Sequence, residues 1–458
     1  MYKLKGSPAA IFQRLWIAGR ADEPTYCTNH GDRRLSAELP SRVAHDLDPV
    51  RFRPVAEPAL NNMHILHVID TLRPGGAQRA LVEIANQTRQ AGATVSVCVT
   101  RDGLDMKAKL KPGIAVFVLG RTRRFDCAAM RRFTNWVEVH NVDVIHSHGR
   151  TSFSFLAFLR TLGMIRRPLV MHDHTGSAEQ GGSAPLWLRA WAGKHVAHYV
   201  GVCAALDGWA ERARIPRERR SLIPCALDLG NGAGAADLNA ADSGKRADRN
   251  ETKQDSREEF AVPRGVLAGI CLGGVRPQKG IDTLLAAAAR CRRRGAFKIV
   301  VVGGVREQSY WNHCLREAKR LSLEQEVLFA GERTDVHDWL GGFDFAVHAA
   351  RSESGPLVVI EHLAAGLPLV CTRVGGIARR AEELGVERFV PPDDPAALTA
   401  ALDEVVTATP QERAARARKG QQIVQRHFDI RSVMPAWRAV YEKASGKPFL
   451  TRNTAAAA

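Results

Sequence analysis

Short apolar segments alternate with amphipathic helical segments in this chain, and the alternation occurs in two separate series. The predicted strands of the first series are residues 64–69, 94–99, 142–146, 168–171 and 198–202. Those of the second series are residues 265–272, 297–302, 327–330, 343–347 and 369–371. Strands that alternate with helices are typical of parallel βαβ units. The sequence therefore predicts an α/β protein with two Rossmann-like domains, whose parallel sheets face each other across a cleft.

Two segments of unusual composition set the predicted domain limits. Residues 1–62 are rich in Arg, Pro, Asp and Glu and carry little periodic pattern, so we expect a poorly ordered extension. Residues 229–258 contain mostly small and polar residues, as in a flexible linker or a surface insertion. The predicted domains are therefore residues 63–228 and 259–435, followed by a C-terminal helix and tail at 436–458.

The N-terminal segment carries a second hypothesis. Met63 stands directly before the first predicted strand, so translation could begin there and the upstream part would not belong to the native protein. Sequencing the N-terminus of the native protein decides between the two starts. Arg14 interrupts the only apolar stretch near Met1, so no secretory signal is expected.

Cysteine usage and charge narrow the class of protein. Nine cysteines are scattered through the 458 residues without a Cys-x-x-Cys pair, which is typical of reduced, buried thiols and predicts a cytoplasmic protein. The formal net charge of +17 attracts polyanions such as nucleic acid, anionic lipid or a phosphorylated substrate. Solvated helix faces explain this charge equally well. The sequence has no helix-turn-helix, RNP or zinc-finger motif, so no nucleic-acid partner is expected.

Two glutamates, Glu353 and Glu361, stand eight positions apart across the predicted start of a helix. Pro356 is typical of the first turn of that helix. The amides near Ser354 and Gly355 would then open a helix N-terminus, which can bind a phosphate group. A carboxylate beside a phosphate and another further along the helix suit a nucleotide-sugar. The spacing alone also describes a solvated loop followed by a buried helix, which is the commoner case.

The residues around this pair resemble the Glu-x7-Glu signature of retaining glycosyltransferases of the GT-B fold, in particular glycosyltransferase family 4. The matching residues are Glu353, Pro356, Leu357, Val358, Glu361, Ala364, Gly366, Pro368, Val374, Gly375 and Gly376. The sequence departs mildly from the signature at two places. Ser354-Gly355 replaces the usual Gly-Phe, and His362 replaces an alanine. The resemblance extends over residues 63 to 445 and is most specific from Gly273 to Gly376.

This resemblance implies roles for the two domains and for several residues. Residues 63–228 would bind the acceptor, and residues 259–435 would bind the nucleotide-sugar. Glu361 would hold the ribose hydroxyls, and Glu353 would act on the donor sugar. Further donor contacts would come from Ser354, Gly355, Pro356 and Leu357.

A basic turn, Gly273-Gly-Val-Arg276-Pro-Gln-Lys279-Gly280, joins a predicted strand to a predicted helix. Two cations beside a helix N-terminus can balance a diphosphate and stabilise it as it leaves. Taken alone, the stretch also fits an ordinary basic turn. It resembles the family variant Arg-Pro-x-Lys-Gly, in which Arg276 and Lys279 would neutralise the diphosphate without a metal ion.

Two further loops resemble the family. Gly75-Gly76 allows a close approach of the backbone to a ligand, and with Gln78 in place of a glutamate it is similar to the Gly-Gly-Ala-Glu loop that faces the donor diphosphate and the acceptor. Arg333 lies in Gly331-Glu-Arg-Thr-Asp335-Val336, which is similar to the loop that lines the nucleotide base pocket.

Two His-x-His pairs, His146-x-His148 and His172-x-His174, end predicted strands of the first series. Such pairs can bind a metal ion, but neither has a nearby third ligand of clear spacing, so no metal site is predicted. The resemblance instead places a histidine at the end of the second strand, near the transferred sugar. His174 matches that position best and His172 is the second choice.

We interpret the chain as a metal-independent, retaining hexosyltransferase that moves a sugar from a nucleotide-diphosphate sugar to a glycan or lipid-linked acceptor, in cell-surface polysaccharide synthesis. The nucleotide-sugar is a substrate, and no cofactor is expected. The basic first domain favours an anionic membrane surface as a further partner, which would place the protein on the inner face of the plasma membrane. Two alternatives stay open: a nucleotide-sugar epimerase or hydrolase on the same fold, and a non-enzymatic polyanion-binding protein.

Overall fold

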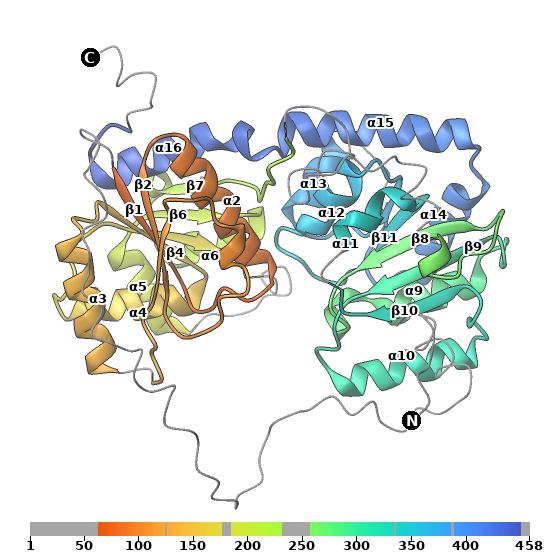
Figure 1. Ribbon diagram of the computed structural model, residues 1–458, viewed down its shortest axis with the longest axis horizontal. Coiled ribbons are helices and arrows are strands. Elements are labelled where there is room, and N and C mark those ends of the chain that lie inside the picture. Colours follow the sequence, from red (N-terminus) through yellow and green to blue (C-terminus); the bar gives the residue numbers. More distant parts are fainter. Residues whose placement is uncertain are drawn as a thin grey trace, which may run out of the picture.

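Two parallel sheets, one in each half of the chain, form the framework of the protein (Figure 1). The computed structural model describes residues 63–123, 126–175, 185–230, 257–333, 336–385 and 389–449. The predicted extension at residues 1–62 and residues 231–256 of the predicted linker lie outside this part of the chain. The prediction of an α/β fold with two parallel sheets is confirmed.

The first sheet has seven parallel strands in the order β3-β2-β1-β4-β5-β6-β7. They are β1 (His64–Ile69), β2 (Thr94–Val99), β3 (Ala115–Val118), β4 (Val144–His148), β5 (Leu169–Asp173), β6 (Val196–Gly201) and β7 (Arg220–Leu222). All six residues of β1 are buried, as expected for a parallel strand that is covered on both faces.

Helices cover both faces of this sheet. They are α2 (Gly76–Gln90), α3 (Cys127–Val139), α4 (Arg150–Thr161), α5 (Leu186–His195), α6 (Ala204–Arg212) and, from the far end of the chain, α16 (Ile430–Ser445). One apolar core lies between the sheet and α3, α4, α5 and α6, and the other lies between the sheet and α2 and α16.

The second sheet has five parallel strands in the order β10-β9-β8-β11-β12. They are β8 (Leu267–Leu272), β9 (Phe297–Val302), β10 (Val327–Gly331), β11 (Phe345–His348) and β12 (Leu369–Cys371). Its helices are α9 (Ile281–Arg290), α10 (Gln308–Arg320), α11 (Val336–Trp339), α12 (Leu357–Ala364), α13 (Gly375–Glu383), α14 (Pro395–Thr407) and α15 (Pro410–His427). One core packs α9, α10 and α14 on this sheet, and the other packs α12 and α13 on it.

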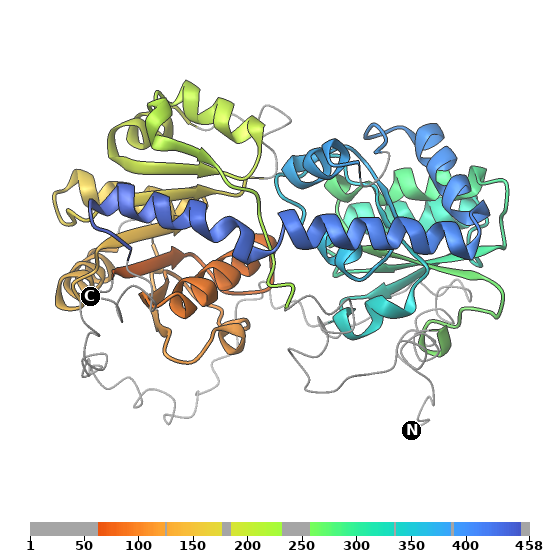
Figure 2. The same cartoon turned by 90° about the horizontal axis from the view of Figure 1, so that it is seen from above.

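The last two helices join the halves, as Figure 2 shows from above. α15 packs against α12 of the second half, whereas α16 packs against α2 and against β4, β5 and β6 of the first sheet. The chain crosses over at Asp429, the N-cap of α16, whose carboxylate accepts a hydrogen bond from the Arg431 N–H. The limit predicted between residues 435 and 436 therefore falls inside a continuous helix that belongs to the first sheet. None of the described helices is both long and apolar enough to cross a membrane.

Candidate active site

The loop between β11 and α12 contains the first glutamate of the predicted pair. Pro356 is the N-cap of α12 and Leu357 is its first residue, so the helix begins where it was predicted to begin. The N–H of Gly376 donates a hydrogen bond of 2.7 Å to the backbone oxygen of Ser354, which ties the loop to the start of α13. Since the first-turn N–H groups of a helix point toward the residues before it, this loop lies where an anionic group can bind.

Lys279 and Glu353 lie together at the carboxyl edge of the second sheet. Lys279 follows β8, Glu353 follows the neighbouring strand β11, and the Nζ of Lys279 forms an ion pair with Oε1 of Glu353. Both side chains are mostly buried, with 13% and 14% of their surface exposed. The structure therefore brings the basic turn and the first glutamate to one place, as the topology of a parallel sheet requires.

His348 is the third titratable group of this cluster. It ends β11, and its Nε2 lies 3.6 Å from Oε1 of Glu353. Burial, followed by the nearby charge of Lys279, lowers the pKa of His348 to about 3. The imidazole is therefore neutral at neutral pH, and the ion pair next to it is a lysine with a single carboxylate.

A glycine allows the basic turn to approach β11 this closely. Gly280, directly after Lys279, has a φ of +61°, and a Cβ there would lie 2.1 Å from the backbone oxygen of Ala349. Any other residue would therefore push the turn away from the loop that carries Glu353.

Arg351 clamps the same two segments from the other side. Its guanidinium binds both carboxylate oxygens of Asp282 over 2.8 and 2.9 Å, and donates to the backbone oxygen of Pro277 over 2.7 Å. Tyr310 donates a further hydrogen bond of 2.6 Å to Asp282. The bidentate geometry fixes the start of α9, and so the position of Lys279, against the loop after β11.

The first half of the chain reaches this site through the segment after β5. The Ser354 hydroxyl donates a hydrogen bond of 3.0 Å to the backbone oxygen of His174. A Cβ at Gly355 would lie 2.9 Å from the sulfur of Cys225, and one at Gly376 would lie 2.5 Å from the backbone oxygen of Val202. Loops from both sheets therefore meet at Ser354, and the role of His174 near the transferred sugar stays a prediction.

The remaining predicted residues lie on the basic turn, on α12 and after β1. Arg276 is exposed at the start of the basic turn. Glu361 lies partly buried on α12, about one turn in from Leu357. Gly75, the N-cap of α2, and Gly76, its first residue, are exposed after β1. Their assignment to the donor site stays a prediction.

Arg333 contacts an acidic side chain and two aromatic rings. Its Nη1 donates to Oε1 of Glu259 over 2.7 Å, and its guanidinium lies over the rings of Phe260 and Trp339. It follows β10, the edge strand, which β9 separates from β8. A role at the nucleotide base, on the periphery of the site, is compatible with this position and stays a prediction.

The two His-x-His pairs of the first sheet gain the third histidine that the sequence did not reveal. Ring nitrogens of His67, His146 and His148 lie within 4.8 Å of one another, and so do those of His148, His172 and His174. The third ligand comes from a neighbouring strand in each case, so spacing along the chain could not show it. The reason for expecting no metal site therefore does not hold.

The sequence also failed to single out Arg351, Asp282 and His348 as partners in this site. Asp282 lies just after the basic turn and Arg351 just before Glu353, and the two residues are 69 positions apart. Their pairing depends on β8 and β11 being neighbours in the sheet. Only the strand order, or a comparison of many related sequences, could have revealed it.

The Arg351 clamp predicts a pH-dependent stability. Burial favours a raised pKa for Asp282, but hydrogen bonds from Arg351 and Tyr310 outweigh it and lower the pKa below its ordinary value. Its contribution to stability is then present above the pKa of the unfolded carboxyl, about 3.9, and is lost as the pH falls through the lower folded value. We expect Asp282→Asn to lower the unfolding free energy by about 1.5–3 kcal/mol at pH 7, with a smaller loss near pH 3.

Thermal unfolding of the two proteins across this pH range measures the difference. Glu383→Gln is the matched control, since Glu383 forms an exposed ion pair with Arg380 and its loss should change little. An equal loss at pH 7 and pH 3, or no loss at pH 7, would contradict the assigned clamp.

Each half of the chain matches a glycosyltransferase family model. Residues 74–231 match the family model described as Glycosyltransferase Family 4, and residues 268–408 match the model described as Glycosyl transferases group 1. Among curated relatives, a D-inositol 3-phosphate glycosyltransferase of Catenulispora acidiphila is 36% identical over 28% of this chain and 32% of its own length. The glycogen synthase of Mycobacterium tuberculosis is 27% identical over 55% of this chain and 60% of its own. The chain thus matches less than two thirds of the length of either relative.

Solved structures share the whole architecture. The Anabaena protein HepE, in a crystal structure with UDP-glucose, superposes with a TM-score of 0.67 over 84% of this chain and 100% of its own, at 21% identity. WaaG, a glycosyltransferase involved in lipopolysaccharide biosynthesis, gives a TM-score of 0.60 over 83% of this chain and 100% of its own, at 16% identity. At these identities the likeness establishes the fold.

Proposed function

Because the chain belongs to the group 1 glycosyltransferases of the GT-B fold, we propose that it transfers a hexose from a nucleotide-diphosphate sugar to a glycan or lipid-linked acceptor, with retention of configuration. The observation that carries the proposal is the meeting of Lys279, Glu353, Ser354 and the backbone of His174 beside the N-terminus of α12. The cationic, anionic and amide groups of this site come from the second half of the chain, and the first half contributes the backbone oxygen of His174.

The diphosphate of the donor would be the anionic partner of Lys279 during the reaction. A phosphate oxygen can replace the Glu353 carboxylate on Nζ, and the exposed Arg276 can approach from the start of the same turn. The N–H groups at the start of α12 add further donors to the anion. These groups stabilise the negative charge that develops as the diphosphate leaves, without requiring a metal ion.

Glu353, once released from Lys279, can accept hydrogen bonds from the hydroxyls of the donor sugar. Glu361 lies about one turn after Leu357, the first residue of α12, and is assigned to the ribose hydroxyls of the nucleotide. His174 brings the segment after β5 to the same loop, on the side of the first sheet. The acceptor would then enter between the first sheet and the donor sugar. The HepE structure with UDP-glucose supports a nucleotide-sugar as the donor class.

A mass-spectrometric screen tests this proposal. The protein is incubated with a panel of nucleotide-sugars, with and without glycan and lipid-linked acceptors. We expect an acceptor product heavier by one hexose unit, an equal amount of nucleoside diphosphate, and an anomeric linkage with the configuration of the donor. Release of free sugar or of an epimer at the same rate without any acceptor would instead favour a hydrolase or epimerase on this fold.

The proposal also places the acceptor at a membrane surface. The start of α5 exposes Leu186 and Trp187, with 75% and 39% of their surface accessible, and Arg189 and Lys194 lie on the same helix. Exposed Trp and Leu next to basic residues are typical of surfaces that lie on anionic lipid. This face of the first half would therefore rest on the membrane while the acceptor enters the site.

Flotation with liposomes measures this contact. We expect the protein to float with vesicles that contain anionic lipid and to float less when Leu186→Ser and Trp187→Ser are combined, because apolar area is lost. Val139→Ser is the matched control, since Val139 is 58% exposed on α3. Equal distributions with anionic and neutral vesicles would reject the membrane contact, and an equal loss in the control would reject α5 as its site.

A further inference from the structure

Five histidines gather on one face of the first sheet. His67 belongs to β1, His146 and His148 to β4, and His172 and His174 to β5 and the residue just after it. In the sheet register, His67 pairs with His146, and His148 pairs with His172. Because alternate residues of a strand share a face, all five rings project to the same side. α16 covers this side with Trp437 and Tyr441.

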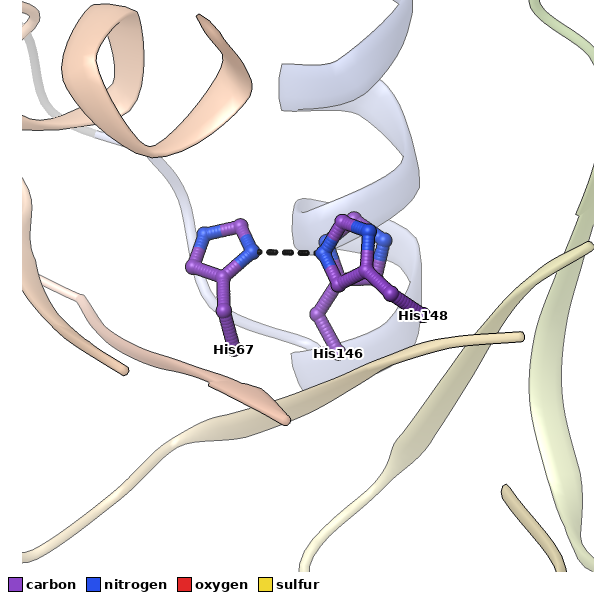
Figure 3. A group of neighbouring side chains, drawn as sticks. All are labelled: His67, His146 and His148. Carbon is purple, nitrogen blue, oxygen red and sulfur yellow. Dashed lines mark hydrogen bonds between the residues drawn. The ribbon is translucent and has the colours of Figure 1, made fainter. Parts of the chain in front are cut away.

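Hydrogen bonds account for only some of the ring nitrogens in this group. Nδ1 of His67 and Nε2 of His148 share a hydrogen bond of 3.0 Å, drawn as the dashed line in Figure 3. Nδ1 of His146 bonds the Tyr441 hydroxyl over 3.0 Å. Within the described structure, six ring nitrogens of these five histidines have no hydrogen-bond partner: Nε2 of His67, Nε2 of His146, Nδ1 of His148, both nitrogens of His172 and Nε2 of His174. Buried polar atoms without a partner are rare and costly, so these six nitrogens require an explanation.

We propose that His148, His172 and His174 form a binding site for a divalent transition-metal ion, with zinc as the best-fitting member of that class. Each ring offers a nitrogen, and these nitrogens lie within 4.8 Å of one another. Tetrahedral zinc with Zn–N bonds of about 2.0–2.1 Å separates its ligand nitrogens by about 3.3 Å, so a modest rotation of the rings closes the site. A water molecule would take the fourth position.

The hydrogen bond between His67 and His148 supports this choice among the five rings. It occupies Nε2 of His148, fixes the orientation of that ring, and leaves Nδ1 available. Ligand histidines in metal sites usually bond a second group through their other nitrogen in this way. His67 would therefore be a positioning residue, and His146 would stack on His148, with ring centroids 4.2 Å apart.

The ligand set selects the kind of ion. It contains three imidazoles and no carboxylate, whereas Mg²⁺ and Ca²⁺ require oxygen ligands. Imidazole suits zinc, copper and nickel.

The position of the site indicates what the ion would do. His174 is partly exposed, whereas His148 and His172 are buried, so the ion would enter from the side of His174. The backbone oxygen of the same residue accepts the hydrogen bond from Ser354. An ion on the His174 ring would therefore hold the segment after β5 against the loop that carries Glu353, a structural role that is separate from the chemistry of sugar transfer.

Metal binding by the untagged, reduced, full-length protein tests the proposal. After dialysis against a chelator, the protein is titrated with Co²⁺, whose visible absorption reports tetrahedral coordination, and the Zn²⁺ form is studied by X-ray absorption. We expect one ion per chain and a shell of imidazole nitrogens at about 2.0–2.1 Å. His172→Gln should weaken binding at least about tenfold, and His67→Phe by about 10–100-fold. His198→Gln is the matched control, because His198 is buried on β6 and already bonds Ser221.

Three results would overturn the proposal. They are the absence of cobalt binding by the wild-type protein, unchanged affinity in His172→Gln, and a sulfur shell at about 2.3 Å, which would assign the ion to cysteines. The absorption spectrum of wild-type protein needs no variant, so it decides even where a substitution prevents folding. None of these readouts depends on transferase activity.

Discussion

Replacing Lys279 by alanine should lower kcat by about 10²–10³-fold, the loss seen when one preorganised donor to a developing anion is removed. The Nζ of Lys279 lies against Glu353 in a mostly buried position, where a charge interacts with a phosphate more strongly than in water. Without this cation, the departing diphosphate would keep only the α12 amides and the exposed Arg276. Steady-state transfer kinetics with a saturating nucleotide-sugar measure the effect.

The control for this variant is Lys319→Ala, in the last turn of α10, where an exposed lysine is lost from the same half of the chain. Circular dichroism and thermal unfolding of Lys279→Ala should show that the fold survives. A folded Lys279→Ala protein with near-normal kcat would remove the lysine from the proposed machinery.

Glu361→Ala should lower kcat/KM for the nucleotide-sugar by roughly 10–150-fold for each charge-assisted hydrogen bond that is lost, since such a bond contributes about 1.5–3 kcal/mol. Because the ribose is bound alike in the ground state and the transition state, the change should fall mainly on KM. Glu383→Ala, on the exposed face of α13, is the matched control. An unchanged KM, or an equal effect in the control, would separate Glu361 from the ribose.

The fold was predictable where strands are buried on both faces. β1, β2 and β9 begin and end at the predicted residues, and all of their residues are buried except Thr94, which is partly buried. β3 and β7 escaped prediction for the opposite reason. They are short strands at the two edges of the first sheet, and none of their residues is fully buried.

The crossing of α16 could not be read from the sequence either. Its sequence has helical periodicity, but an amphipathic pattern does not determine which sheet a helix will cover. Trp437 and Tyr441 pack in one apolar core with residues of the first sheet. These contacts join parts of the chain more than 300 positions apart, such as Trp437 and the strand that contains His67.

The site was predictable as far as parallel topology determines it. The loops after β8 and β11 had to meet if the two strands were neighbours, and this brings Lys279 to Glu353. The partner of Arg351 and the third histidine of each His-x-His group depend instead on strand order and register. Strand order and register are properties of the assembled sheet, and they cannot be deduced from a single sequence.

Calorimetric titration with nucleoside diphosphates and monophosphates tests the central claim most directly. If the basic turn and the loop before α12 form one diphosphate site, UDP, GDP or ADP should bind the wild-type protein at least about tenfold more tightly than the matching monophosphate, a difference of about 1.4 kcal/mol. That advantage should disappear in Lys279→Ala. Equal affinity for the two classes, or an advantage that survives the substitution, would contradict the account.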